Sequence, residues 1–504
     1  MAKSIMIQGT MSNAGKSLIA AGLCRIFKQD GYKVAPFKSQ NMALNSYVTS
    51  EGLEMGRAQV VQAMAAGVEP SVRMNPILLK PTTDMGSQVI VQGQVVGNMC
   101  AMDYFAKKKE YIPVIRESYE QLAADHDIIV IEGAGSPAEI NLKQDDIVNM
   151  GMAKIADAPV LLVGDIDRGG VFAQLIGTVM LLEPEEQARI KGLIVNKFRG
   201  DKKILDPGII MLEERAGKPV LGVVPYADVD IEDEDSLASS LEETHIQAEI
   251  DVAVIRFPRI SNFTDMQALS MERDVSVRYV TKPSELGEPD VILLPGTKNT
   301  IQDLLWLRES GLEAKITRLA KKGTIVFGIC GGYQMLGESL MDPLQTESAL
   351  GSVRGMGLLP VTTVFEEEKQ LENRAYRIGI LEGNFVSLSN KKIAGYEIHM
   401  GRTEVAGKTT TPIYPFVSDS AGTVLGYTAG TVAGSYIHGI FDEIAFREAF
   451  IELLYARKGK TRGESEHLTL QEYREQQFDK LAQVLRESLD MEKIYEILGL
   501  IKQG

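Results

Sequence analysis

A glycine-bearing loop near the start of the chain has the residue types of a phosphate-binding site. The segment Gly9-Thr-Met-Ser-Asn-Ala-Gly15-Lys16-Ser17 follows a short apolar run and precedes the periodic apolar sequence LIAAGLCRIF. In such a loop, backbone N–H groups bind phosphate oxygens, the lysine neutralises the outer phosphates, and the serine hydroxyl ligates Mg²⁺. We predict that the nucleotide is bound by Gly9, Thr10, Ser12, Asn13, Ala14, Gly15, Lys16 and Ser17. The alternative is a turn capped by Ser17, because the loop has five residues between its glycines instead of the usual four.

Two later strand patterns end in polar side chains that belong with this loop. The run Asp127-Ile-Ile-Val-Ile-Glu132 ends in a carboxylate before a glycine-rich turn, and the run IKGLIV is closed by Asn196. Ligands of open α/β sheets bind at the carboxyl edge of the strands, so we expect Glu132 to hold Mg²⁺ together with Ser17. Asn196 is placed to contact the adenine edge. The alternatives are a helix cap or ion pair for Glu132 and a strand-end turn for Asn196.

Two further polar loops follow strand patterns, and we expect both to face the phosphate loop. Amide and guanidinium groups there could hold substrate carboxylates, while Gly169 and Gly170 permit close backbone approach. The candidate substrate-binding residues are Lys38, Gln40, Asn41, Asn45, Asp165, Asp167 and Arg168. Structural turns and surface ion pairs are the alternatives.

A cysteine in the second half of the chain has the local sequence of a nucleophile. The strand pattern Thr324-Ile-Val-Phe-Gly-Ile runs directly into Cys330 and two glycines, so the thiol lies at a strand-to-helix turn. Such a turn exposes the sulfur, and the following helix N-terminus favours the thiolate. The backbone N–H groups of Gly296 and Gly331 are placed to form an oxyanion hole.

A nucleophilic thiol requires a base, and the chain has five histidines. His438 closes the strand pattern Gly434-Ser-Tyr-Ile-His, near the end of the second α/β region, where it can return to the cysteine. His399 is the competing candidate and could instead position substrate. We predict that Cys330 and His438 are the catalytic pair.

Short apolar runs that alternate with amphipathic segments must position these residues. In the first half the runs are Ser4 to Gln8, Val34 to Phe37, Val89 to Gln92, Ile128 to Glu132, Val160 to Gly164, Leu193 to Asn196 and Val220 to Val224. In the second half they are Val252 to Phe257, Val275 to Val280, Val291 to Leu294 and Ile325 to Ile329, then shorter pieces at Gly357 to Val364, Arg377 to Leu381, Gly395 to His399 and Ser435 to His438. This alternation is typical of parallel sheets wrapped by helices, so we predict an α/β protein with two doubly wound domains.

An acidic segment poor in aromatic residues, DVDIEDEDSLASSLEE, separates the two regions. We predict a first domain over residues 1–228, a linker over 229–248, a second domain over 249–455 and a helical C-terminal tail over 456–504. The tail contains the amphipathic segment Leu468 to Leu500, which is either a packing helix or an oligomer contact.

Composition excludes several classes of protein. The 504 residues include 53 Lys+Arg and 68 Asp+Glu, a net charge of −15 that argues against nonspecific binding to nucleic acid or anionic membranes. Three cysteines are too few for a disulfide framework, and we expect Cys24 and Cys100 to be buried hydrophobes. The start of the chain lacks the long apolar stretch of a signal peptide. We therefore predict a cytoplasmic protein without a nucleic-acid or membrane partner; the sequence leaves the oligomeric state open.

Over nearly the whole chain these residues resemble known families. The sequence Gly328-Ile-Cys-Gly-Gly-Tyr-Gln334, with a downstream His438, resembles class I glutamine amidotransferases, and the phosphate loop resembles that of the dethiobiotin synthetase group of P-loop enzymes, with the same extra residue. With QNM at 40–42, SPAEINL at 136–142, GDIDRGG at 164–170 and NKFRG at 196–200, the chain resembles the cobyric acid synthase family.

This resemblance implies a P-loop NTPase-like domain followed by an amidotransferase-like domain, in which Gln334 joins Gly296 and Gly331 around the glutamine. It implies ATP- and glutamine-dependent amidation, with Mg²⁺ and without a tightly bound prosthetic group. The substrate would be adenosylcobyrinic acid a,c-diamide, a corrinoid of cobalamin biosynthesis, amidated at its b, d, e and g carboxylates to give adenosylcobyric acid.

The sequence departs from typical class I amidotransferases at one point. Their histidine is followed two residues later by glutamate, whereas Ile440 stands here. Cys330 and His438 therefore act as a dyad, or Asp442 or Glu397 orients the histidine. Two other functions remain open: the a,c-diamidation of cobyrinic acid by the same pair of domains, and a P-loop partitioning or regulatory ATPase with an inactive amidotransferase-like domain.

Overall fold

The computed structural model describes residues 2–500, apart from 83–85, 232–247, 408–410 and 464–467. The chain forms two compact units. The first unit comprises Met1–Ala43, Glu54–Glu232 and Arg474–Gly504, and the second comprises Leu44–Leu53 and Asp233–Tyr473. Each unit is therefore assembled from separated parts of the chain, whereas the sequence predicts contiguous domains. Most of the predicted linker, 229–248, lies outside the described residues.

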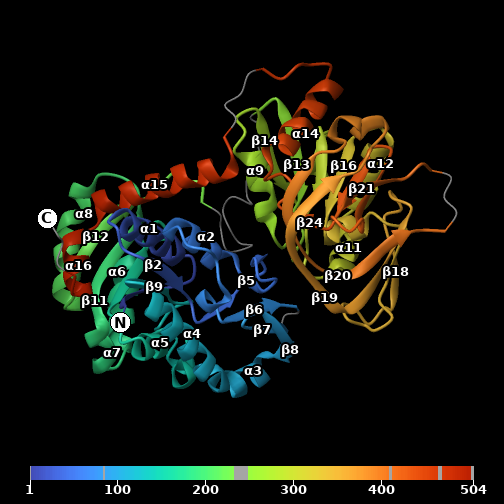
Figure 1. Cartoon of the computed structure of the whole chain (residues 1–504). Helices are drawn as coiled ribbons and strands as arrows, with labels where there is room; N and C mark the ends of the chain where they lie inside the picture. Colours follow the sequence, from blue (N-terminus) through green and yellow to red (C-terminus); the bar gives the residue numbers. More distant parts are fainter. Residues whose placement is uncertain (1, 83–85, 232–247, 408–410, 464–467, 501–504) are drawn as a thin grey trace. The chain divides into compact units, whose positions relative to one another are not determined.

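A six-stranded parallel sheet forms the centre of the first unit, as the alternation predicts (Figure 1). Its order is β12 (Val220–Pro225), β11 (Ile190–Phe198), β10 (Val160–Asp165), β1 (Lys3–Gly9), β9 (Ile128–Glu132) and β2 (Val34–Phe37). Every residue of β9, β10 and β2 is buried, which explains their nearly continuous apolar sequences. Gly9 pairs with Val163 and Ile7 with Glu132, so the polar ends of these strands meet at one edge.

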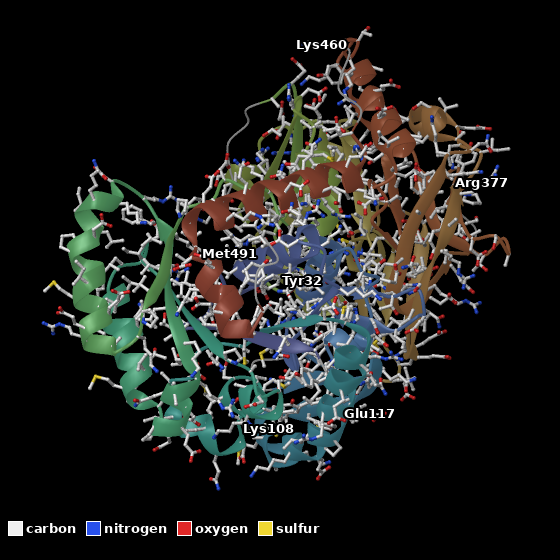
Figure 2. All side chains as sticks on the ribbon, turned by 60° about the vertical axis from the view of Figure 1, so that its left-hand side comes forward. Tyr32, Lys108, Glu117, Arg377, Lys460 and Met491 are labelled. Atoms are coloured by element: carbon white, nitrogen blue, oxygen red, sulfur yellow. The ribbon has the colours of Figure 1, made fainter. Side chains whose placement is uncertain are left out.

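Helices cover this sheet, and two of them come from the end of the chain. The helices from the first half of the chain are α1 (Lys16–Gln29), α2 (Arg57–Ala66), α4 (Ile112–Asp125), α5 (Met150–Ile155), α6 (Val171–Leu181), α7 (Pro184–Arg189) and α8 (Lys202–Ala216). The C-terminal pair is α15 (Leu470–Ser488) and α16 (Met491–Leu498), and Figure 1 shows these red helices beside blue α1. Leu485 and Ile494 join the same buried cluster as Leu23. Tyr32 and Met491, labelled in Figure 2, border this contact.

The predicted tail is therefore a packing element of the first unit from Arg474 onward. Polar contacts accompany the apolar ones, since the Arg25 guanidinium donates to Asp479 at 2.7 Å and also pairs with Glu475. Of the two interpretations of Leu468 to Leu500, the structure supports the packing helix.

A second sheet in the first unit, of mixed strand direction, is not predicted from the sequence. It consists of β3 (Gln40–Met42), β6 (Ile77–Pro81), β7 (Gly86–Val91) and β8 (Gln94–Cys100) in that order, and α3 (Ala101–Lys107) follows it. The apolar run Val89 to Gln92 belongs here and not to the parallel sheet. Gln92 and Gly93 both have positive φ, 49° and 76°, which makes a tight hairpin between β7 and β8. Cys24 is buried as predicted, but Cys100 is exposed at the end of β8.

The second unit contains one mixed sheet. Its parallel part is β14 (Val275–Val280), β13 (Ile250–Ile255), β15 (Val291–Leu294), β16 (Ile325–Ile329) and β23 (Val432–Ser435). Antiparallel strands extend it: β22 (Val424–Ala429), β21 (Tyr414–Ser418), β19 (Val361–Ile378) and β20 (Lys392–Val405), with the short strands β17 (Ser339–Met341), β18 (Ser352–Arg354) and β24 (Ile437–His438). The predicted separate pieces at 357–364 and 377–381 are wrong in extent, because β19 is one long strand paired along β20.

The second unit also contains α-helices. They are α9 (Gln267–Ser270), α10 (Pro283–Leu286), α11 (Thr300–Glu309), α12 (Leu312–Lys321), α13 (Gly331–Met335) and α14 (Ile444–Arg457). None of the described helices has the length and apolar character needed to cross a bilayer.

Candidate functional site

The turn between β16 and α13 holds Cys330 in a strained backbone conformation, with φ 52° and ψ −112°. Non-glycine residues rarely adopt positive φ, and such strain is typical of a nucleophile elbow. The glycines around it are required by space, because a Cβ on Gly332 would lie 2.0 Å from the Leu294 carbonyl oxygen. Cys330 is only 8% exposed, so the sulfur is more enclosed than the sequence predicts.

His438 lies beside this cysteine and is 1% exposed. Its Nδ1–H donates to Oδ2 of Asp265 at 2.7 Å, and Oδ1 of the same carboxylate accepts the Gly439 N–H at 2.9 Å. Burial alone would lower the pKa of His438. The charge of Asp265 and hydrogen bonds to Asp265 and Cys330 outweigh it and raise that pKa to about 10. The geometry therefore supports an imidazolium beside the nucleophile at neutral pH.

The two predicted oxyanion glycines lie close to this pair. A Cβ on Gly296 would be 3.1 Å from Cε1 of His438, and a Cβ on Gly331 would be 3.3 Å from the backbone nitrogen of Thr297. The turn after β15 and the start of α13 are thus in contact beside the sulfur. This closeness is what two converging N–H donors require.

Gln334, which the resemblance places around the glutamine, is buried, and its side-chain amide bonds to other residues of the protein. Its Oε1 accepts from the Thr300 hydroxyl at 3.0 Å, and its Nε2 donates to the Met400 carbonyl at 3.0 Å. The side chain therefore joins α11, α13 and β20.

In the first unit the phosphate loop is held by its own Lys16 and by Asn196 from β11. Nζ of Lys16 donates to the carbonyls of Met11 at 3.0 Å and Gly135 at 3.2 Å, so the lysine crosses the loop. Nδ2 of Asn196 donates to the Ala14 carbonyl at 2.9 Å. A Cβ on Gly15 would lie 2.0 Å from that same nitrogen, and Gly15 has φ 97°. The amide expected to contact adenine is thus engaged by the loop backbone.

Glu132 is the centre of a buried polar network at the end of β9. Its Oε1 accepts from the Ser17 hydroxyl at 2.8 Å and from Nζ of Lys38 at 2.9 Å, and its Oε2 accepts from Nε2 of Gln62 at 2.6 Å. Burial would raise the pKa of Glu132, but the charge of Lys38 and hydrogen bonds from Lys38, Ser17 and Gln62 lower it. The group is therefore a carboxylate.

The oxygen pair of Ser17 and Glu132 fits Mg²⁺. This ion keeps several waters and takes one or two protein carboxylates together with substrate phosphates. In the described part of the chain, no group of three or more His, Cys, Asp or Glu side chains is arranged to hold a metal. A magnesium held mainly by nucleotide phosphates is consistent with both observations.

Comparisons with known proteins agree with this pair of sites. Residues 5–237 match the CobQ/CobB/MinD/ParA nucleotide binding domain, and residues 251–446 match the CobB/CobQ-like glutamine amidotransferase domain. A cobyric acid synthase from Lachnoclostridium phytofermentans is 58% identical, over 99% of this chain and 99% of the relative. The chain belongs to the cobyric acid synthase family. Cobyric acid synthases from Ruminiclostridium cellulolyticum and Streptococcus sanguinis are 55% and 50% identical, over 99% of this chain and 97% and 99% of the relatives.

The residue that orients the histidine in this cobyric acid synthase family member was missed from the sequence. The candidates were Asp442 and Glu397, but Nδ1 of His438 faces Asp265, on the 3₁₀ turn Phe263–Met266. Glu397 instead accepts from Nε2 of His399 at 3.2 Å. His399 also stacks on Tyr436 with ring centroids 3.7 Å apart, so it belongs to a separate cluster. The available signal was an acidic residue soon after the first strand of the second region.

Several predicted substrate residues have hydrogen-bond or ion-pair partners within the protein. Lys38 is buried against Glu132, and Asp165 is buried and accepts from Nζ of Lys197 at 2.9 Å. Asn41 is buried and donates to Gln59 at 3.1 Å. Asn45 lies in the second unit, where its Oδ1 accepts the Asn262 N–H at 2.7 Å. The sequence gives no sign that the chain leaves the first unit there, and substrate binding by Asn45 stays a prediction.

Three members of that predicted set remain nearer the surface. The side chain of Arg168 is 58% exposed and lies 3.8 Å from Asp165, and Asp167 pairs with Arg199 at 3.2 Å. Gln40 accepts a hydrogen bond from the Tyr104 hydroxyl. Of these, Arg168 has the exposed cation that a carboxylate ligand needs.

Proposed function

We propose that the chain converts adenosylcobyrinic acid a,c-diamide to adenosylcobyric acid, using ATP and glutamine to amidate the b, d, e and g carboxylates. The observation that carries this is full-length identity of 50–58% to relatives named cobyric acid synthase. The two sites supply the two halves of the chemistry, a glutaminase at Cys330 and an ATP site at the phosphate loop.

The second unit releases ammonia. The Cys330 thiolate attacks the side-chain carbonyl carbon of glutamine, and N–H groups of Gly296 and Gly331 stabilise the developing oxyanion. The His438 imidazolium gives its proton to the departing nitrogen, so the C–N bond breaks and ammonia leaves. Water, deprotonated by the same histidine, then hydrolyses the thioester to glutamate and the free thiol. Asp265 keeps the ring oriented through both steps.

The first unit activates the acid. A carboxylate is a poor acyl donor, so the terminal phosphoryl group of ATP is transferred to a corrinoid carboxylate oxygen. Ammonia then attacks the acyl carbon, and phosphate leaves. Backbone N–H groups of the loop and Lys16 hold the phosphates, and Ser17 and Glu132 hold Mg²⁺. When bound, that ion neutralises charge on the phosphate oxygens.

The test is incubation of purified protein with adenosylcobyrinic acid a,c-diamide, glutamine and ATP-Mg, followed by mass spectrometry of the corrinoid. Four successive acid-to-amide conversions are expected. If this substrate is inert while cobyrinic acid becomes its a,c-diamide in a parallel incubation, the protein performs that sister reaction. Inertness toward both, without glutamine hydrolysis, would instead favour a regulatory ATPase.

A further inference from the structure

A short segment encoded within the nucleotide-binding half is built into the second unit. Residues Leu44–Leu53, here termed the Leu44–Leu53 segment, follow Ala43 and precede Glu54, which both belong to the first unit. The segment contains the short strand β4 (Ser46–Val48). Asn45 and Ser46 are each 1% exposed, and Val48 is fully buried. Such burial of polar side chains requires specific partners.

Asn45 and Ser46 both form hydrogen bonds with Asn262. Oδ1 of Asn45 accepts the Asn262 N–H at 2.7 Å, and the Ser46 N–H donates to Oδ1 of Asn262 at 3.0 Å. Asn262 has φ 53° and ψ 37°, a left-handed conformation that costs energy and needs support from its surroundings. The reciprocal bonds supply that support.

Asn262 touches the catalytic histidine on one side and the turn of Asp265 on the other. Its Nδ2 is 3.5 Å from Nε2 of His438. Its carbonyl accepts the Asp265 N–H at 3.1 Å, which starts the 3₁₀ turn carrying the carboxylate. A shift of Asn262 would therefore move both groups that set the imidazole orientation.

The segment also supports the face of the imidazole. Tyr396 stacks on His438 with centroids 5.2 Å apart and planes 19° apart, and its hydroxyl donates to the Ser46 carbonyl at 3.3 Å. Tyr47 packs edge-on against Tyr396 at 5.4 Å. Val48 shares a buried cluster with Tyr396 and with Ile398, whose carbonyl faces Sγ of Cys330 at 3.6 Å.

We propose that Asn45 is a positioning residue for glutamine hydrolysis, acting on His438 through Asn262, and that the Leu44–Leu53 segment is a working part of the glutaminase site. The proposal rests on the proposed function, since it assumes that Cys330 and His438 hydrolyse glutamine. Asn45 is assigned no contact with the reacting atoms. Its effect comes from fixing a proton donor whose small displacement is costly to the rate.

The first test is Asn45→Ala with separate nitrogen sources. We expect kcat for glutamine-dependent activity to fall about tenfold or more, the effect of one hydrogen bond on the barrier. KM for glutamine should stay within about twofold, since ground-state binding is untouched. Amidation supported by ammonium salts should keep its wild-type rate. Glu51→Ala, an exposed substitution in the same segment, is the control and should match wild type in every assay.

A second variant, at Asn262, distinguishes loss of His438 positioning from loss of folding. Asn262→Gly keeps the left-handed backbone accessible while it removes the amide, so it should lower kcat for glutamine at least as much. The double variant should lose no more than Asn262→Gly alone, because both changes break one path to His438. Additive losses, or a folded Asn45→Ala protein with normal kcat, would overturn the proposal.

Two other results would also be decisive. Equal loss of the glutamine-dependent and ammonia-dependent reactions in Asn45→Ala would assign the residue to the amidation step or to general stability, against the proposal. If the wild-type protein hydrolyses no glutamine, the proposed function fails first and this inference fails with it. If the wild-type protein hydrolyses glutamine and Asn45→Ala does so at the same rate, only this inference is contradicted and the proposed function stands.

Discussion

Nδ1 of His438 lies 2.7 Å from Oδ2 of Asp265, although 173 positions separate the two residues in the sequence. The carboxylate comes from the turn after β13 and the histidine from β24. Both side chains are almost completely buried. The pair completes a Cys330–His438–Asp265 arrangement in which the orienting acid precedes the nucleophile in the chain, unlike the glutamate two residues after histidine in typical class I amidotransferases.

Asp265→Asn should lower glutaminase kcat by about 10²-fold or more, because an amide can present the wrong hydrogen-bonding group to Nδ1. It should also move the alkaline limb of the kcat profile to lower pH. Without the charge of Asp265, burial lowers the pKa of His438 from about 10, and the imidazolium is lost earlier. Steady-state glutaminase assays between pH 6 and 10 measure both effects.

The control for that experiment is Asp442→Asn. It changes a carboxylate close in sequence to His438 without removing the group that faces Nδ1. Its pH profile should follow that of wild type. A normal Asp265→Asn enzyme together with an impaired Asp442→Asn enzyme would reverse the assignment.

The same pKa shift links folding to pH. The pKa of His438 is raised from 6.5 to about 10 on folding. The folded state therefore binds the proton more tightly, and the resulting stabilisation is fully present below pH 6.5 and is lost as pH rises through about 10. Denaturant unfolding of the second unit, followed by probes in that unit, should show this fall in wild type. The fall should be smaller in Asp265→Asn, and equal slopes in both proteins would contradict the linkage.

Cys330→Ser should abolish glutamine-dependent amidation yet keep amidation with ammonium salts at raised pH, where free ammonia is abundant. The reason is that Cys330 acts only in the second unit, while activation of the carboxylate takes place in the first. Mass spectrometry of the corrinoid measures the amidation supported by glutamine and by ammonium salts separately. Cys100→Ser, at an exposed cysteine, should leave both reactions unchanged. Failure of ammonia to rescue Cys330→Ser would count against two separate sites.

Lys16→Ala should abolish amidation from either nitrogen source. Nζ of Lys16 crosses the phosphate loop at 3.0 Å from the Met11 carbonyl, and no other residue of the loop carries a positive charge. Phosphate release and corrinoid conversion, measured with ammonium salts, should both fall by about 10²-fold or more, as expected when charge stabilisation is removed from phosphoryl transfer. Lys202→Ala, at an exposed position, is the matched control. Normal turnover in Lys16→Ala would remove the loop from the mechanism.

Leu485→Ala should destabilise the first unit by about 2–5 kcal/mol, since it opens a cavity in a fully buried position. A Cβ on Gly22 of α1 would lie 2.3 Å from Cδ1 of Leu485, so the two helices pack closely. Gln483→Ala, on the exposed side of the same helix, should change stability by less than about 0.5 kcal/mol. Calorimetry with and without ATP-Mg identifies the affected transition. Equal melting temperatures for the two variants would refute the docking of α15.

The site residues that the sequence indicates are those whose signals are local. The phosphate loop, Glu132 and Cys330 each stand where an apolar strand pattern ends, and parallel strands bring such ends to one edge. His438 is predicted as the base because the chain has only five histidines. In each case the residue type and its position on one element were enough.

The residues missed from the sequence depend on contacts between distant segments. Asp265 has no local pattern that separates it from an ordinary surface acid, and Asn45 follows a strand of one unit but packs in the other. The run Val89 to Gln92 is predicted as part of the parallel alternation but lies in the antiparallel hairpin of β7 and β8, because a short buried run has the same sequence pattern in both kinds of sheet. These features are set by the topology of the whole chain.

The return of the C-terminal helices has a consequence for the order of biosynthesis. A ribosome releases the parallel sheet and α1 early, but Phe478, Leu485 and Ile494, which share a buried cluster with Leu23 and Phe27, are made after the second unit. The side of α1 that packs against α15 and α16 therefore stays exposed to solvent while the entire glutaminase unit is translated and folds. The second unit can fold before α15 and α16 complete the core of the first unit. A chaperone that recognises nascent chains would find that face of α1 exposed while the second unit is synthesised.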